Sequence, residues 1–179
     1  MATEIAHGGP PGRAVETDRN CFFGVIGVNR CRSMSTKRQA SGEDYPDAAI
    51  KHCDDARHLL SASRPDGAAY LAGYAVECAL KTLVQVEERS TRRLRSHDLN
   101  DLSMEALRLA AQATNKTARY LTNPALTTLR YDNPPAGWKE YLRYYPVGTV
   151  PTPTAEQWVE EAERLYIEII GELKKNGEI

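Results

Sequence analysis

The chain has 179 residues, and its 23 Lys and Arg against 24 Asp and Glu give a formal net charge of −1. This length suits one domain with an extension, and 41% apolar with 26% charged residues is ordinary for a soluble globular protein. The balanced charge excludes a chain that is polybasic throughout, but leaves room for a local basic patch. No apolar run approaches the roughly 18 residues of a membrane span, and no signal peptide is recognisable, so we expect no membrane association.

Cysteines and histidines carry no metal-binding pattern. The four cysteines show no CxxC spacing, which excludes a zinc finger and a thioredoxin-type motif. His52 and His58 lie six residues apart and would fall on different faces of a helix. We therefore expect a protein of the reducing cytoplasm, with no metal site and no cofactor.

The N-terminal part of the chain differs from the rest. Residues 1–44 hold half of the twelve glycines and show no helical periodicity. We interpret 1–44 as an irregular or disordered N-terminal extension and 45–179 as the folded domain.

Two helices are predicted next. Apolar residues between 47 and 61 recur every three or four positions with charged residues on the other side, which is typical of an amphipathic helix. Pro65 interrupts this pattern. The segment 66–88 then carries a stripe of small residues at spacings of four, three and four: Ala68, Ala72, Ala75 and Ala79. Such a stripe lets another helix approach closely, so we expect the second helix to be largely buried.

Connectors and helices alternate along the remaining chain. The predicted segments are a polar connector at 89–102, a helix at 103–114, a shorter helical piece at 117–129, an aromatic- and proline-rich loop at 130–153 with a turn of helix at 138–144, and a final helix at 154–175. Thr154 and Gln157 are spaced as a capping box, and Gly177 is placed as a C-terminal cap. No segment alternates with period two, so the predicted class is all-α, an antiparallel bundle of four to five helices.

Three elements of this sequence resemble the HEPN domain, a family named for higher eukaryotes and prokaryotic nucleotide-binding proteins. They are the run Tyr70-Leu-Ala-Gly-Tyr-Ala-Val-Glu-Cys-Ala-Leu-Lys81, the group His97-Asp98-Leu99, and the pair Arg130-Tyr131 before a long final helix. The resemblance covers about 45–175. It implies a small helical bundle that usually dimerises, often encoded beside a minimal nucleotidyltransferase as a toxin–antitoxin or defence pair.

Many members of the family are metal-independent ribonucleases, and others are non-catalytic modules that bind RNA or nucleotide. The ribonucleases carry an arginine, four to six residues, and then a histidine near the start of the final helix. Here the last histidine is His97, so the final helix contains none. Arg92 and His97 have four residues between them, but they lie in the connector after the second helix.

Candidate site residues have a functional and a structural interpretation. In the functional interpretation, His97 is the general base for a ribose hydroxyl and Arg92 stabilises the charge that builds up on the phosphate. In the structural interpretation, His97 and Asp98 cap the third helix. Arg92 and Arg93 belong to a cluster of four arginines that would hold an RNA backbone, or form a solvated charge run.

The other candidates are binding residues. Glu77 and Lys81 are spaced for an ion pair and lie on the polar side of the second helix, where they pair with Arg130 or line a groove. Arg130, Tyr131 and Tyr144 belong to a stretch that interleaves cations and aromatics, which suits stacked bases and held phosphates. The structural alternative is a loop whose tyrosines pack back on the bundle.

Two functions remain open from the sequence. The first is a dimeric module that associates with RNA or nucleotide and with a partner protein, such as a nucleotidyltransferase in a toxin–antitoxin or defence pair. The alternative is a metal-independent endoribonuclease toxin that uses Arg92 and His97 in a dimer cleft.

Overall fold

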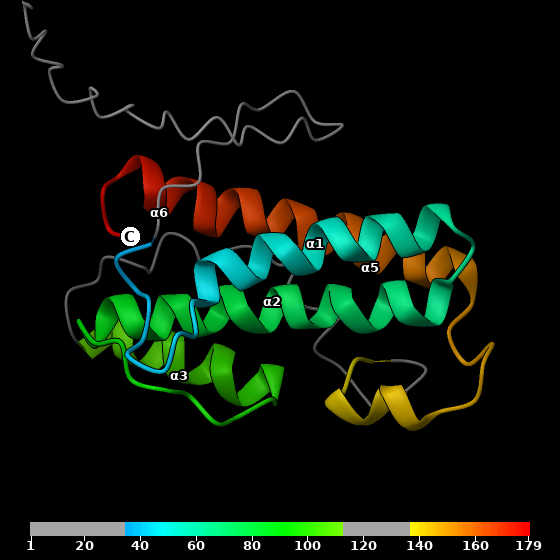
Figure 1. Ribbon diagram of the computed structural model, residues 1–179. Coiled ribbons are helices and arrows are strands. Elements are labelled where there is room, and N and C mark those ends of the chain that lie inside the picture. The colour runs from blue at the N-terminus through cyan, green and yellow to red at the C-terminus, as the bar shows by residue number, and fades with distance from the viewer. Residues whose placement is uncertain (1–34, 113–136) are drawn as a thin grey trace, which may run out of the picture. The chain divides into compact units, whose positions relative to one another are not determined.

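A computed structural model describes residues 35–112 and 137–179, which belong to one compact unit, 34–179. Its elements are α1 (Tyr45–Ser61), α2 (Pro65–Glu87), α3 (Leu99–Gln112), a 3-10 turn η3 (Glu140–Tyr144), and a long C-terminal helix formed by α5 (Thr152–Leu165), a π-helical stretch η4 (Tyr166–Gly171) and α6 (Glu172–Lys175). These ranges contain helices and no strand, which confirms the predicted all-helical bundle (Figure 1). Residues 1–34 of the expected irregular extension 1–44, and the expected helix at 117–129, fall outside the described residues.

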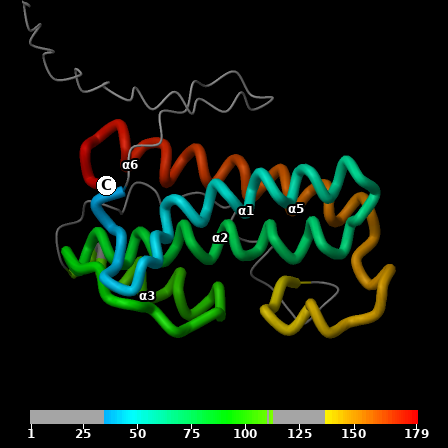
Figure 2. The backbone as a smooth tube through the Cα atoms, in the orientation of Figure 1, coloured from blue at the N-terminus to red at the C-terminus, as the bar shows by residue number. Residues whose placement is uncertain are grey.

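The first two helices form an antiparallel hairpin (Figure 2). At the start of α1, the Asp44 carboxylate accepts a hydrogen bond from the Asp47 N–H at 3.2 Å, which satisfies one of the free donors of the first turn. Ser63 takes a φ of +57° just after α1, and Pro65 then opens α2, where its fixed φ suits the first turn. The predicted break between the two helices is confirmed.

Helix α2 is the centre of the bundle. It contacts α1, α3, η3, α5 and η4, and the four alanines of the predicted stripe are at most 1% exposed. Side chains without bulk let the backbones of neighbouring helices come close, which confirms the interpretation of the stripe. The C-terminal helix completes the core with large apolar residues: Trp158, Leu165, Ile169, Ile170 and Leu173.

We expect Ala75→Leu to lower the free energy of unfolding by about 1–3 kcal/mol, because a tightly packed site has no room for three added carbons. Urea denaturation followed by circular dichroism measures this loss. Ala111→Leu on the exposed face of α3 is the control and is expected to leave the denaturation midpoint unchanged. Equal midpoints for both variants would contradict close packing at Ala75.

Two helix starts differ from the sequence predictions. Helix α3 begins at Leu99 rather than at 103, because the Asp98 carboxylate accepts from the N–H groups of Asn100 and Asp101 and so caps the helix there. Helix α5 begins at Thr152 with no side-chain cap, so the predicted capping box of Thr154 and Gln157 is wrong. Pro153 in the first turn lets the helix start earlier, since its missing N–H needs no partner there.

Hydrogen bonds hold both ends of the folded unit in place. Residues 35–44 form turns against α2, where Lys37 Nζ donates to the Gln85 carbonyl at 3.5 Å. Gly177 has a φ of +67°, and the N–H of Glu178 donates to the Leu173 carbonyl at 3.0 Å, which confirms the predicted C-terminal cap.

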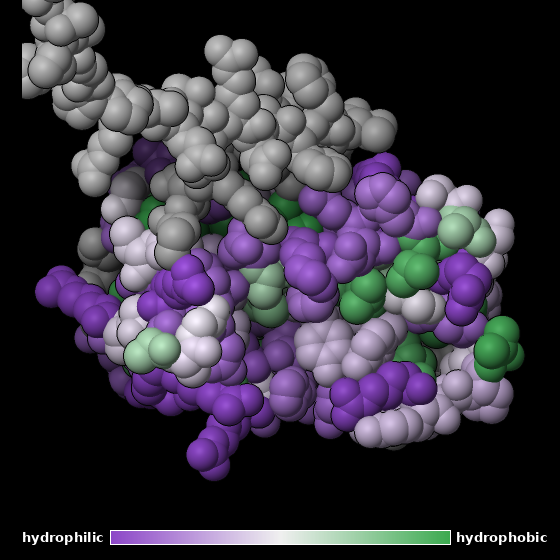
Figure 3. Space-filling model, viewed as in Figure 1, coloured by the Kyte–Doolittle hydropathy of each residue, from purple (hydrophilic) through white to green (hydrophobic). Residues whose placement is uncertain are grey.

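Hydrophilic side chains predominate on the face shown in Figure 3. None of the described helices is long and apolar enough to cross a membrane.

Candidate functional site

Three charged or polar side chains meet beside the middle of α2. Glu77 and Lys81 are almost fully buried, and Lys81 Nζ donates to Glu77 Oε1 at 2.7 Å. His97 approaches the same carboxylate, with its Nδ1 at 3.1 Å from both oxygens. Its side chain is 46% exposed, so His97 connects a buried ion pair to the surface.

The connector between α2 and α3 is fastened along its length. It folds back along α2, and α3 then follows α2 in the same direction (Figure 2). Gln85 Nε2 donates to the Arg92 carbonyl at 3.0 Å, and the Tyr45 hydroxyl accepts from the Leu94 N–H at 2.9 Å. These bonds determine where His97 lies, although it stands 20 residues after Glu77 in the chain.

The contact with Glu77 determines how His97 presents its imidazole. A carboxylate accepts hydrogen bonds but has none to give, so Nδ1 carries the proton that points to Glu77. The other ring nitrogen, Nε2, is then available to exchange protons or to meet a ligand. The buried carboxylate therefore orients an exposed histidine, an arrangement that suits proton transfer as well as binding.

Asp98, the next residue, links the connector to η3. Its carboxylate forms an ion pair with Lys139 Nζ while it caps α3. The hydrogen bond from Lys139 lowers the pKa of Asp98, and the backbone N–H groups of α3 add to this effect. The predicted structural role of His97 and Asp98 at the third helix is thus filled by Asp98.

We expect Asp98→Ala to destabilise the protein by about 1–2 kcal/mol through loss of the cap, and Asp98→Asn to lose less because an amide oxygen also caps. The ion pair stabilises the fold above the unfolded pKa of about 3.9 and stops doing so as the pH falls through the lower folded value. Urea denaturation from pH 7 to pH 2 should therefore show the wild type and Asp98→Asn converging at acid pH. A constant difference would contradict the ion pair.

A cluster of aromatic rings lies beside His97, with Tyr74 at its centre. The ring centroid of Tyr74 is 5.0 Å from that of Tyr70, 5.1 Å from Trp138, 5.7 Å from His52 and 6.2 Å from His97. Trp138 is buried, sits on Gly73, and donates from Nε1 to the Tyr70 carbonyl at 2.9 Å. Burial, and then the hydrogen bond between the Tyr70 and Tyr74 hydroxyls, raise the pKa of Tyr74, so its phenol stays protonated.

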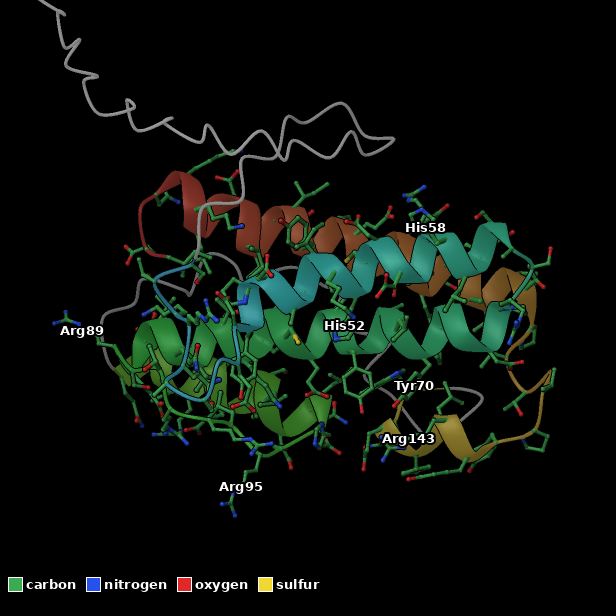
Figure 4. All side chains as sticks on the ribbon, viewed as in Figure 1. His52, His58, Tyr70, Arg89, Arg95 and Arg143 are labelled. Atoms are coloured by element: carbon green, nitrogen blue, oxygen red, sulfur yellow. The ribbon has the colours of Figure 1, made fainter. Side chains whose placement is uncertain are left out.

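Arg143 completes this face of the bundle from η3. One of its terminal nitrogens donates to the Tyr70 hydroxyl at 3.3 Å, and its guanidinium carbon lies 4.8 Å from the centroid of the Tyr144 ring. In Figure 4, Tyr70 and Arg143 lie close together beside η3, whereas His58 extends from the opposite edge of the bundle. We call the surface formed by His97, Tyr74, Tyr70 and Arg143, with the buried Trp138 behind it, the His97–Arg143 face.

A comparison with protein-family models matches the HEPN domain over residues 43–173, which is most of the chain. The chain belongs to the HEPN domain family. This is a family of nucleotide-binding and ribonuclease-type domains. The match confirms the resemblance found in the sequence. No curated protein and no solved structure matches the chain.

Arg92 and Arg93 of this HEPN domain form their ion pairs with other residues than His97. Arg92 Nε donates to the Glu88 carboxylate at 2.6 Å and makes no hydrogen bond to His97, so the structure does not bring these two described residues together. Arg93 pairs with Glu43 at 3.0 Å, and Arg95 extends into solvent (Figure 4). Of the other predicted binding residues, Tyr144 lies on η3, whereas Arg130 and Tyr131 fall outside the described residues.

The sequence places Arg143 in the stretch of cations and aromatics, and Tyr70 and Tyr74 on the polar side of the second helix, but it did not predict Trp138 or the contacts that join these rings. One signal pointed to them: Gly73 is a helix-weakening residue in the middle of a strongly helical HEPN segment. Such a glycine indicates the close approach of another group, which the structure identifies as the indole of Trp138. Glu77, the partner of His97, was predicted from the sequence only to be spaced for an ion pair with Lys81; its contact with His97 was not predicted.

Proposed function

We propose that this HEPN domain binds single-stranded RNA or nucleotide on the His97–Arg143 face. The observation that carries the proposal is a continuous series of contacts from the connector to η3. His97 packs against Tyr74, the Tyr74 ring against Tyr70, and the Tyr70 hydroxyl accepts from Arg143. An imidazole and a guanidinium, 46 positions apart in the sequence, thereby occupy one surface together with aromatic rings.

This combination of groups suits nucleic acid. A guanidinium provides fixed N–H donors that match phosphate oxygens, and an imidazole binds phosphate or a ribose hydroxyl. Aromatic rings accept stacked bases of any sequence. Two carboxylates of the region are engaged, since Glu77 holds Lys81 and His97 while Asp98 holds Lys139.

Fluorescence anisotropy of a labelled single-stranded RNA tests the proposal with the full chain. If two or three phosphates are held, raising the salt from 50 to 200 mM should weaken binding about 7- to 20-fold. Arg143→Gln and His97→Gln should each weaken binding without changing the unfolding midpoint by more than a small amount, because both side chains reach the surface.

His58→Gln and Arg108→Gln are the matched controls. His58 is exposed on α1 and extends from the opposite edge of the bundle, and Arg108 is exposed on α3, where it pairs with Glu105. Both variants should bind RNA as the wild type does. If the affinity for RNA does not change with salt concentration, or if the control variants lower it as much as Arg143→Gln does, the proposed face is wrong.

The proposal includes protein partners. HEPN domains often act as dimers, and the sequence resemblance implies a nucleotidyltransferase partner in a toxin–antitoxin or defence pair. We propose that this chain is a homodimer and one half of such a pair. Light scattering on the purified chain should give twice its mass of 19.9 kDa, and a monomer at micromolar concentration would contradict this part.

RNA cleavage is the second candidate function, and the contact of His97 with Glu77 favours it. A histidine oriented by a buried carboxylate is suited to act as a general base, since one nitrogen is held and the other is free. Arg92, the other predicted catalytic residue, would act only after leaving Glu88. Incubation with RNA in excess chelator should yield cleavage by the wild type and none by His97→Ala; intact RNA in both would exclude cleavage of that substrate.

A further inference from the structure

Three of the six large apolar side chains that are exposed in the described part of the chain lie close together in sequence. Tyr144 is 75% exposed, Tyr145 43% and Val147 98%, all on η3 or directly after it. Contiguous exposed apolar groups commonly mark a surface that binds something.

This segment is held in a defined shape. Leu142 is buried within η3, and the Asp66 carboxylate accepts from the N–H groups of Gly148 and Val150 at 2.7 and 2.8 Å. Trp138, just before η3, is anchored on α2. Tyr144 is therefore presented by a turn that is fastened on both sides.

The two faces of the Tyr144 ring are not equivalent. One face lies under the guanidinium of Arg143, which the Tyr70 hydroxyl holds in place. With three quarters of the residue exposed, the opposite face is open to solvent. Tyr145, by contrast, stacks on Tyr141 with their centroids 6.2 Å apart and an angle of 25° between the planes.

We propose that one unpaired nucleobase of a bound RNA strand stacks on the open face of Tyr144, opposite Arg143. This inference rests on the proposed RNA-binding function and gives its substrate class: a single strand or a loop, because a base inside a duplex has no free face. Arg143 then has two roles, since it supports the tyrosine ring by a cation–π contact and attracts the adjacent phosphate.

Local charge favours an RNA base over an apolar protein surface. Residues 141–150 contain Arg143 and no acidic residue, and Asp66 beneath them is occupied by backbone N–H groups. Glu140 is the acidic residue on η3 itself, and Lys139 stands next to it. A phosphodiester can therefore run past the turn without facing a row of carboxylates.

Stacking can be measured with 2-aminopurine, a fluorescent base, placed in a single-stranded RNA. Binding to the wild type should quench its fluorescence, because stacking on an aromatic ring does so. Tyr144→Phe keeps the ring and should quench and bind within about twofold of the wild type. Tyr144→Ala should abolish the quenching and weaken binding about 5- to 150-fold, the range that one lost base stack produces.

Val147→Ala is the matched control, since it removes exposed apolar surface from the same segment but no ring. It should bind and quench as the wild type does; an equal loss in Val147→Ala and Tyr144→Ala would indicate apolar docking and overturn base stacking. Duplex RNA of the same sequence should bind more weakly than the single strand. If single strands bind and Tyr144→Ala changes nothing, this inference fails while the RNA-binding function stands; if the wild type binds no RNA, both fail.

Discussion

Gly73→Ala is expected to lower the free energy of unfolding by about 3 kcal/mol or more. A Cβ atom at this position would meet the indole of Trp138 far inside 3.0 Å, a separation that Cβ atoms essentially never go below. The indole must move, and its hydrogen bond to the Tyr70 carbonyl and its place in the core are lost together. Displacing a buried tryptophan costs as much as a large cavity mutation.

Urea denaturation gives the loss of stability, and tryptophan fluorescence should shift to the red as Trp138 becomes exposed to water. Gly171→Ala is the control, because Gly171 lies in the C-terminal helix and an added methyl group would extend into open space there. That change should be neutral or should stabilise by up to about 1 kcal/mol. The same midpoint for both glycine variants would show that Trp138 does not rest on α2.

Glu77→Ala is expected to cost about 3–5 kcal/mol, because it leaves the buried ammonium of Lys81 without its counter-charge. It also releases His97, so RNA binding should weaken in any molecules that remain folded. The double variant Glu77→Leu with Lys81→Met removes both charges and should regain most of the lost stability, since apolar groups of similar volume often replace a buried pair without loss.

The exposed pair of Lys51 and Asp55 on α1 provides the comparison. Their side chains are 61% and 48% exposed, and Asp55→Ala should change the free energy of unfolding by less than about 0.5 kcal/mol. A loss from Glu77→Ala as small as that from Asp55→Ala would show that Lys81 reaches water in solution.

Periodicity predicted the helices of this chain well, because the amphipathic pattern and the alanine stripe are local properties of the sequence. The helix starts were harder to predict: α3 starts at a cap formed by Asp98, and α5 starts at a proline-containing turn. Several residue types can cap a helix, so spacing alone did not select the one in use. The pairing of Glu77 with Lys81 was visible because helix geometry brings positions four apart together.

The sequence did not predict which distant residues contact one another in the candidate site. Contacts of His97 with Glu77, and of Arg143 with Tyr70, join positions 20 and 73 residues apart. They depend on a connector that folds back along α2 and on a 3-10 turn anchored by Trp138. No local pattern encodes such contacts, and the arginine cluster drew attention to Arg92, which the structure pairs with Glu88.

Photo-crosslinking tests most directly whether RNA lies on the His97–Arg143 face. The full chain is irradiated in complex with a single-stranded RNA that contains 4-thiouridine, and mass spectrometry identifies the linked peptides. We expect links to peptides that contain Tyr74, His97 or Tyr144, and their loss at high salt. Links confined to the outer faces of α1 and α5, with none near His97 or η3, would contradict RNA binding on this face.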